Sequence, residues 1–402
     1  MENKIIPYGK HEITQEDISA VVKVLESDFL TQGPLIGEFE QRFAQYIGST
    51  YAVAVSNGTA ALHLSVLALK VKPGDKIITT ALTFAASANC IKYCGGEVVF
   101  VDIDPETYLI DLNEVELLLK SAPAGTYKGV IPVDFAGRAV DLERCRKLGD
   151  AYNLWVLEDA CHAPGASFVD SQGNNQSCGN GQFADLAIFS LHPVKHIAAG
   201  EGGVITTNDK GLYEQLLKLR SHGITKSEWE FENTVAQAGG NVVSGEYPKW
   251  YMEMQALGYN YRLTDFQCAL AMSQLQRAND GLNRRRKIAK NYDTAFNEHP
   301  KIRAKIPALN HETYGKHAYH LYVIQVENRL EMYDHLRGKG IFAQVHYYPV
   351  HFMPYYRAFG WKEGDLPVVE AYYQCCLSIP MYPSLQMEQQ KDVINNIINF
   401  YI

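Results

Sequence analysis

A lysine at position 195 follows a short apolar run, 186–189, and precedes the glycine-rich segment 200–203. The apolar run predicts a buried strand that ends in Ser190. A lysine just past the carboxyl end of a parallel strand lies where α/β sheets bind their ligands, and the glycines let the backbone pass close to a bound group. Taken alone, the segment is also compatible with a solvated loop lysine.

Two carboxylates, Glu158 and Asp159, end another apolar run at 154–157. Apolar neighbours on one side predict partial burial, and a buried carboxylate needs a cationic partner. The protonated ring nitrogen of a cofactor is one such partner. A structural salt bridge or a helix cap is the alternative for this segment alone.

The segment 56–59, Ser-Asn-Gly-Thr, separates a predicted strand from a predicted helix. Backbone N–H groups at a helix N-terminus can hold a phosphate. The segment is neither a Walker A motif nor G-x-G-x-x-G, so nothing here indicates a nucleoside triphosphate or dinucleotide site. A plain N-cap is the alternative.

Together these segments place a phosphate cradle, a carboxylate and, 36 positions after the carboxylate, a lysine at the strand ends of one predicted sheet. Pyridoxal 5'-phosphate (PLP) needs a phosphate anchor, an anion that faces its pyridine nitrogen and an amine that forms a Schiff base. The combination favours a PLP site over the separate structural interpretations.

The elements that would position these residues follow an alternating pattern. Short apolar runs separated by helical segments are typical of a mostly parallel, buried sheet. We therefore expect an α/β fold with a large domain at 15–265, after an N-terminal arm at 1–14. The predicted strands are 52–55, 76–80, 98–101, 129–133, 154–157, 186–189 and 204–207.

Helix signals frame this domain. Thr14 is expected to cap a first helix with an apolar stripe, and a second helix is expected at 36–46. Thr264-x-x-Gln267 resembles a capping box that opens one long helix to about residue 291. The remainder, 266–402, is predicted to be a smaller α+β domain. The stripe is Ile18, Val21, Val22 and Leu25; the small domain's strands are 320–326 and 342–346, and polar surface loops are expected at 170–182 and 225–249.

Composition limits the classes of function. The 402 residues include 37 Lys and Arg against 45 Asp and Glu, a net charge of −8, with 47% hydrophobic and 20% charged residues. This balance excludes disorder as the dominant state and disfavours nucleic-acid binding. The basic run 284–287 is predicted to lie on a solvated helix face.

No stretch of the sequence indicates a membrane span, and 1–10 has no apolar core of a signal peptide. The eight cysteines lack zinc-site spacing, so neither a metal site nor a disulfide scaffold is expected. Buried free thiols fit a reducing, cytoplasmic location.

At this point the motifs resemble a known family, the DegT/StrS-type nucleotide-sugar aminotransferases. The resemblance covers nearly the whole chain. Segments 6–9, 27–34 and 190–195 are most similar to the subgroup that acts in pseudaminic acid biosynthesis. The motifs that carry the family resemblance are 56–62, 158–163, 189–195, 200–203 and 258–265.

The resemblance implies a fold-type I aminotransferase with a mostly parallel seven-stranded sheet, acting as a homodimer whose active sites are shared between subunits. Lys195 would hold PLP as a Schiff base, and Asp159 would pair with the pyridinium nitrogen. His162 stands where family members commonly have Gln near the cofactor 3-hydroxyl, a contact that an imidazole can also make. The other implied cofactor contacts are a stacking ring at Phe84, phosphate ligands at Gly58, Thr59 and Ser190, and Asn260 reaching the phosphate from the neighbouring subunit.

The resemblance also implies a pocket for a sugar nucleotide. For the histidine and tyrosines among its residues, a structural role in the core is the alternative, as it is for Phe84; for Asn260 the alternative is a turn residue. The 225–249 loop is longer than in the family pattern and has no assigned role. The implied pocket residues are Tyr8, Asp28, Thr31, Val345, His346, Tyr347 and Tyr348.

The implied reaction moves an amino group from L-glutamate, which leaves as 2-oxoglutarate, to carbon 4 of a UDP-linked 4-keto-6-deoxy-N-acetylhexosamine. Lys195 would also carry the proton between donor and cofactor. Other 4-keto sugar nucleotides, of the perosamine or bacillosamine type, are the main alternative. Relatives that dehydrate sugars have His at the lysine position, so Lys195 argues against that reaction. A non-catalytic sugar-nucleotide binder on the same fold is the remaining alternative.

Overall fold

The computed structural model describes residues 5–296, 302–303 and 315–401. Its central feature is a seven-stranded sheet with the strand order β2-β10-β9-β6-β5-β3-β4. β10 runs antiparallel to both of its neighbours, and the other adjacent strands are parallel. The sheet strands are β2 (Tyr51–Val55), β3 (Lys76–Thr80), β4 (Glu97–Val101), β5 (Tyr127–Ile131), β6 (Trp155–Asp159), β9 (Leu186–Ser190) and β10 (Gly203–Thr207).

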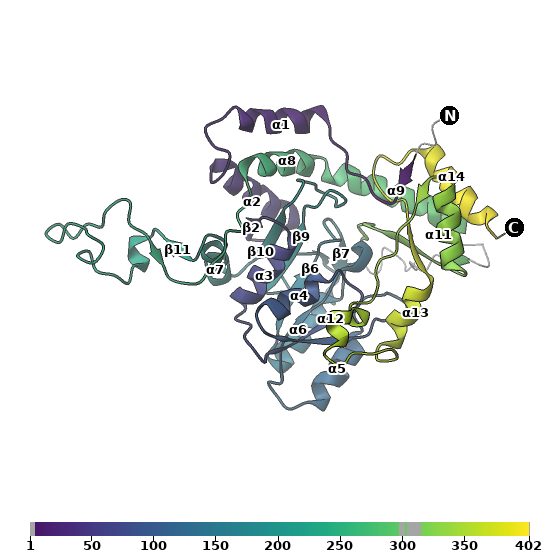
Figure 1. Cartoon of the computed structure of the whole chain (residues 1–402), viewed down its shortest axis with the longest axis horizontal. Helices are drawn as coiled ribbons and strands as arrows, with labels where there is room; N and C mark the ends of the chain where they lie inside the picture. Colours follow the sequence, from purple (N-terminus) through teal and green to yellow (C-terminus); the bar gives the residue numbers. More distant parts are fainter. Residues whose placement is uncertain (1–4, 297–301, 304–314, 402) are drawn as a thin grey trace.

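Helices join these strands and cover the sheet (Figure 1). The strands are buried almost throughout, which explains why they read as continuous apolar runs rather than alternating ones. The predicted α/β class and the seven-stranded, mostly parallel sheet are confirmed. The helices are α1 (Gln15–Leu25), α2 (Pro34–Ile47), α3 (Gly58–Ala68), α4 (Ala86–Tyr93), α5 (Leu112–Ser121), α6 (Leu142–Tyr152) and α7 (Lys210–Arg220).

The first helix begins as predicted but faces the other way. Thr14 and Asp17 form a capping box, and Arg277, the residue that follows α8 (Asp265–Gln276), pairs with the buried Asp17 carboxylate. The predicted apolar stripe points outward: Ile18 is 47% exposed and Leu25 is 57% exposed. The buried ion pair, rather than the stripe, sets the orientation of α1 on α8.

The long helix expected after Thr264 is two helices, because α8 ends at Gln276 and α9 (Ala278–Phe296) begins after Arg277. The basic run on α9 is not a solvated face. Arg285 is 2% exposed and donates hydrogen bonds to the carbonyls of Tyr319, His320 and Met381. Burial lowers its pKa to about 10. The prediction that 284–287 lies on a solvated face was wrong, because the Arg285 guanidinium ties α9 to the carbonyls of C-terminal segments.

The C-terminal part is a three-stranded antiparallel sheet with helices around it. Ile6 of the N-terminal arm packs in its core, because β1 (Ile6–Pro7) pairs with β15. The division of the chain into an N-terminal arm at 1–14, a large domain at 15–265 and a small domain at 266–402 stays a prediction. The elements are β13 (Ile302–Arg303), β14 (Tyr322–Val326), α11 (Arg329–Gly338), β15 (Ile341–Phe342), α12 (Pro354–Arg357), α13 (Pro367–Cys375), β16 (Cys376–Ile379) and α14 (Met387–Asn399).

The two predicted loops differ from each other. Segment 170–182 contains β8 (Asn175–Ser177), which pairs with β7 (Ser167–Val169), so it is partly ordered into a hairpin. Segment 225–249 lies in an arm that projects from the body beyond β11 (Ile224–Thr225) and β12 (Glu253–Met254) (Figure 1). The arm exposes Trp229 and Trp250 by 79% and 81%.

Over the described residues, no helix has both the length and the apolar character that crossing a bilayer requires. The eight cysteines, all within the described residues, are free thiols.

Candidate active site

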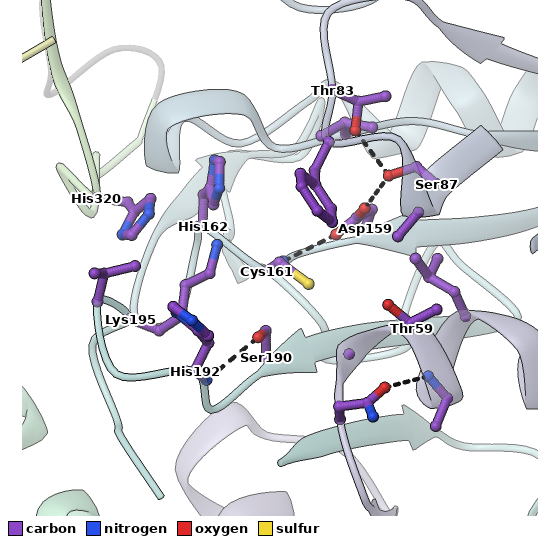
Figure 2. Close-up of a pocket in the computed structure, with 18 of the residues that line it drawn as sticks. Thr59, Thr83, Ser87, Asp159, Cys161, His162, Ser190, His192, Lys195 and His320 are labelled. Carbon is purple, nitrogen blue, oxygen red and sulfur yellow. Dashed lines mark hydrogen bonds between the residues drawn. The ribbon is translucent and has the colours of Figure 1, made fainter. Parts of the chain in front are cut away.

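A pocket of about 890 Å³ opens at the carboxyl edge of the sheet. Its walls come from the residues that follow β2, β3, β6 and β9, from the start of α3, and from segments near 320 and 346. Parallel strands end at the same edge, so residues far apart in the sequence meet there. Figure 2 shows Lys195, Asp159, Ser190 and Thr59 around this pocket.

Lys195 lies in the loop between β9 and β10. The loop turns at this point, where the backbone amide of Lys195 donates a hydrogen bond to the His192 carbonyl at 2.8 Å. Its half-buried side chain points into the pocket (Figure 2). Among the described residues its amine has no hydrogen-bond or ion-pair partner. Burial lowers the pKa of Lys195, while Cys161 and Asp159 act in the opposite direction. A partly desolvated amine of this kind is suited to nucleophilic chemistry.

Asp159, at the end of β6, is 5% exposed. Its Oδ2 accepts a hydrogen bond from Ser87 Oγ at 2.6 Å, and its Oδ1 accepts from the Cys161 amide at 3.2 Å. Because Ser87 gives its proton to the carboxylate, the 2.7 Å contact between Thr83 and Ser87 must have Thr83 as donor. The carboxylate is therefore held in one orientation, with lone pairs left for a cation in the pocket.

The start of α3 forms an anion cradle. Asn57 Oδ1 caps the helix by accepting from the Ala60 amide at 2.8 Å, and the amides of Gly58 and Thr59 in the first turn have no intrahelical acceptor. Ser190 stands opposite: a Cβ added to Gly58 would lie 3.2 Å from Ser190 Cβ. Glycine thus leaves room for a phosphate between the helix N-terminus and the Ser190 hydroxyl.

Histidines and a tyrosine form the opposite side of the pocket. His162 Nδ1 accepts from the Ala136 amide at 3.3 Å, and its Nε2 is 3.3 Å from the Tyr347 hydroxyl. The His320 ring packs on His162 with a centroid distance of 4.2 Å. Burial, with Lys195 nearby, lowers the pKa of His162 and His320 well below the usual range. Both imidazoles are therefore neutral at physiological pH.

Most of the residues expected to bind the cofactor, and some expected to bind substrate, meet in this pocket. Phe84 is 64% exposed at its edge rather than in the core. Lining the pocket are Tyr8, Gly58, Thr59, Phe84, Asp159, His162, Ser190, Lys195, His346 and Tyr347.

The other expected residues do not line it. Asp28 and Thr31 are exposed on the connection between α1 and α2, and Asn260 is exposed and bridges to Ser221. Val345 packs against the core clusters on both sides. Tyr348 turns away and lines a different cavity with Phe352 and Tyr373. Asn260 was expected to reach the phosphate of the neighbouring subunit, and the roles of all five residues stay predictions.

Sequence reasoning missed Ser87, Thr83 and His320. The hydroxyls of Thr83 and Ser87 stand four positions apart at the end of a strand and the start of a helix, a signal that could have been noticed. His320 carried no such signal, because it reaches the pocket from a segment more than a hundred residues away from Lys195 in the sequence.

The residues present fit PLP. A phosphate cradle, a carboxylate with fixed orientation and an unpartnered lysine amine share one pocket, which is the set of contacts that this cofactor requires. At the carboxyl edge of a mostly parallel seven-stranded sheet, they define the class of fold-type I aminotransferases.

Comparison with known proteins gives the family. A model of the DegT/DnrJ/EryC1/StrS aminotransferase family matches residues 11–398, and the chain belongs to this family. It is a PLP-dependent nucleotide-sugar aminotransferase.

Two curated relatives are similar over nearly their whole length. The spore coat polysaccharide biosynthesis protein SpsC of Bacillus subtilis is 37% identical, over 98% of this chain and 97% of that protein. The UDP-4-amino-4,6-dideoxy-N-acetyl-beta-L-altrosamine transaminase of Campylobacter jejuni is 33% identical, over 98% and 97%.

Two solved structures are similar in fold. Helicobacter pylori PseC, an aminotransferase of pseudaminic acid biosynthesis, is 29% identical with a TM-score of 0.85, over 98% of this chain and 99% of that one. The sugar aminotransferase Spr1654 of Streptococcus pneumoniae in its PLP form is 27% identical with a TM-score of 0.83, over 98% of each chain.

Proposed function

We propose that this chain transfers an amino group from L-glutamate to carbon 4 of a UDP-linked 4-keto-6-deoxy-N-acetylhexosamine. The observation that carries the proposal is the meeting of the Lys195 amine, the Asp159 carboxylate and the Gly58–Ser190 cradle in one pocket. The substrate is supported by the similarity to the Campylobacter jejuni transaminase and to PseC. The product is a UDP-4-amino sugar of the kind used for pseudaminic acid.

When bound, PLP supplies an electrophilic carbonyl and a ring that withdraws electrons from a neighbouring carbon. Asp159, held by hydrogen bonds from Ser87 and the Cys161 amide, would keep a proton on the pyridine nitrogen. Gly58, Thr59 and Ser190 would hold the phosphate and so fix the ring relative to Lys195. Phe84, exposed at the open edge of the pocket, would lie against the ring.

Lys195 has two tasks. Its Nζ would hold the cofactor covalently, and, once displaced by the donor's amine, the same atom would take the proton from the donor's α-carbon and deliver it to the carbonyl carbon of the cofactor. The lowered pKa favours the neutral amine that proton uptake needs. A positioned base of this type contributes about 10²–10⁴-fold to rate.

A second substrate is supported by the 37% identity to SpsC, a spore coat polysaccharide protein. In that case the acceptor is another 4-keto sugar nucleotide, including those of the perosamine and bacillosamine type. Tyr8 and His346 line the pocket beyond the cofactor contacts and are proposed to contact the sugar.

The test uses purified protein with PLP, glutamate and a small panel of 4-keto sugar nucleotides, with the aminated product identified by mass. We expect the UDP-linked 4-keto-6-deoxy-N-acetylhexosamine to gain nitrogen fastest. A sugar that loses water without gaining nitrogen would refute the reaction type, and preference for another panel member would move the substrate to the SpsC-like alternative.

Lys195→Ala is expected to lose essentially all turnover, because one amine both binds the cofactor and carries the proton. Borohydride reduction followed by peptide mapping should place the pyridoxyl group on Lys195 in the unmodified protein. Lys391→Ala, at an exposed lysine on α14, is the matched control and should keep normal activity. Near-normal transamination by Lys195→Ala would contradict the assignment.

We also propose a homodimer with shared active sites. Asn260 lies outside its own chain's pocket, is exposed and bridges to Ser221, which suits a residue that reaches a partner's phosphate site. Asp28 and Thr31, exposed in the same chain, are proposed to meet substrate in that assembly. Free thiols throughout are consistent with a reducing compartment.

A further inference from the structure

A short chain of hydrogen bonds on the histidine side of the pocket has a fixed direction. The Ala136 amide can only donate, so His162 Nδ1, 3.3 Å away, must be the acceptor. A neutral imidazole carries one N–H, and burial keeps His162 neutral by lowering its pKa. The hydrogen of His162 is therefore on Nε2, and it points to the Tyr347 oxygen at 3.3 Å.

This direction determines what Tyr347 can do. Its oxygen accepts from His162, so its own hydrogen must point elsewhere. In the described part of the chain the Tyr347 hydroxyl has no other partner, and the residue lines the pocket. Burial raises the pKa of Tyr347, so the hydroxyl keeps its proton. Tyr347 thus offers a hydrogen-bond donor to whatever occupies the pocket.

The covalent structure of PLP shows which of its atoms this donor meets. In the pyridine ring the carbonyl carbon is opposite the nitrogen, the phosphate arm is on one side of the carbonyl and the 3-oxygen is on the other. With the nitrogen at Asp159, the carbonyl at Lys195 and the phosphate at Ser190 and Thr59, the 3-oxygen faces the remaining side. Figure 2 shows His162 on that side, across Lys195 from Ser190.

We propose that the Tyr347 hydroxyl donates a hydrogen bond to the 3-oxygen of PLP, and that the Ala136 amide sets this direction through His162. Tyr347 is a cofactor-binding residue in this arrangement, and His162 is a positioning residue that acts through it. The inference rests on the proposed function. A donor at this oxygen stabilises its negative form, which strengthens binding and lowers its affinity for a proton.

The experiment compares Tyr347→Phe with the unmodified protein and with Tyr348→Phe. The control removes the same atom from the next residue, which is 44% exposed and lines another cavity. Two quantities are measured: the dissociation constant of PLP from the apoenzyme, by quenching of intrinsic fluorescence, and the pH midpoint of the visible absorbance change of the holoenzyme. Thermal unfolding verifies that each variant is folded.

For Tyr347→Phe we expect about a tenfold weaker affinity for PLP, the usual effect of losing one hydrogen bond to a charged group, and a midpoint at higher pH. Tyr348→Phe should match the unmodified protein. His162→Phe should also weaken the affinity for PLP and raise the pH midpoint. The double variant, His162→Phe with Tyr347→Phe, should differ little from Tyr347→Phe alone, because the two residues act as one unit.

The inference would be overturned if Tyr347→Phe binds PLP with an affinity within twofold of normal and has a pH midpoint that equals the normal one within experimental error. If Lys195 of that variant still carries the pyridoxyl group after reduction, the proposed function stands without it. Absence of the group from Lys195 of the unmodified protein would instead refute the proposed function itself. Should Tyr347→Phe fail to fold, His162→Phe gives the same readouts, because phenylalanine removes both the acceptor for the Ala136 amide and the N–H that faces Tyr347.

Discussion

The orientation of a single carboxylate shows how individual residues shape this site. Asp159 receives hydrogen bonds from Ser87, at the start of α4, and from its own neighbour Cys161. Thr83 in turn donates to Ser87. The carboxylate therefore needs no rearrangement when a cation arrives, which is the advantage of a preorganised site.

Ser87→Ala tests this arrangement. Loss of a hydrogen bond to a charged group costs about 1.5–3 kcal/mol, so we expect PLP to bind at least tenfold more weakly. Turnover with saturating PLP should fall less than in Lys195→Ala, because the lysine is intact. Fluorescence quenching of the apoenzyme measures the affinity, and Ser121→Ala, at an exposed serine, is the control. Unchanged affinity would mean that Asp159 does not depend on Ser87.

At the scale of elements, the strand that carries Asp159 also carries a buried acid pair. Glu158 on β6 and Asp134 after β5 are buried together with Cys178, their ligand atoms within 4.8 Å of one another. The Val140 amide donates to Asp134 Oδ1 and the Gly179 amide to Glu158 Oε2. Over the described residues, the remaining carboxyl oxygens have no other partner. The pair therefore shares a proton, since two adjacent carboxylates cannot both be ionised in a buried site.

The shared proton predicts a pH dependence of stability. Burial raises the pKa of Asp134 to about 6, and burial with the neighbouring acid raises that of Glu158 well above its usual range. Between the ordinary carboxyl pKa and these raised values the folded state binds more protons than the unfolded state. The free energy of unfolding must then fall as pH rises through about 6 and above.

Urea unfolding at several pH values measures the effect. Each unit of pKa shift corresponds to about 1.4 kcal/mol, so the loss across this range should exceed about 1 kcal/mol. Asp134→Asn should flatten the dependence, because the amide supplies an N–H in place of the shared proton. Asp150→Asn, at a side chain 71% exposed on α6, should leave it unchanged. An equally steep slope in Asp134→Asn would exclude the acid pair as its source.

For the whole molecule, the proposed dimer has a consequence that one chain cannot show. If Asn260 completes the partner's site, an Asn260→Ala chain paired with a Lys195→Ala chain forms one intact site and one doubly altered site. Random reassociation makes half of the dimers mixed, so activity should recover to about a quarter of normal.

The measurement mixes the two variants after mild dissociation and follows turnover and molar mass together. Each variant alone should be a dimer with little activity. If the mixture stays as inactive as its components, although mass shows that the chains have exchanged, Asn260 acts within its own subunit and does not complete the partner's site.

Particular residues show how far the sequence could be read. Lys195, Asp159 and the Gly58–Thr59 turn were predictable because strand ends of a parallel sheet converge, so local patterns already implied proximity. The sequence did not predict the outward face of α1, the burial of Arg285 or the opposite directions of Tyr347 and Tyr348. Each depends on a contact with a distant segment: Arg277 with Asp17, Arg285 with the carbonyls after 318, and the cavity beside Tyr373.

The sequence by itself therefore determined the class of fold, the order of the elements and the residue types that hold a PLP-like cofactor, since apolar periodicity and turn chemistry act over short distances. Only the tertiary structure decided which side chains share the pocket, which arginines are buried, and which nitrogen of His162 bears its hydrogen. Those depend on burial and on hydrogen bonds between segments far apart in the chain, which no local pattern encodes.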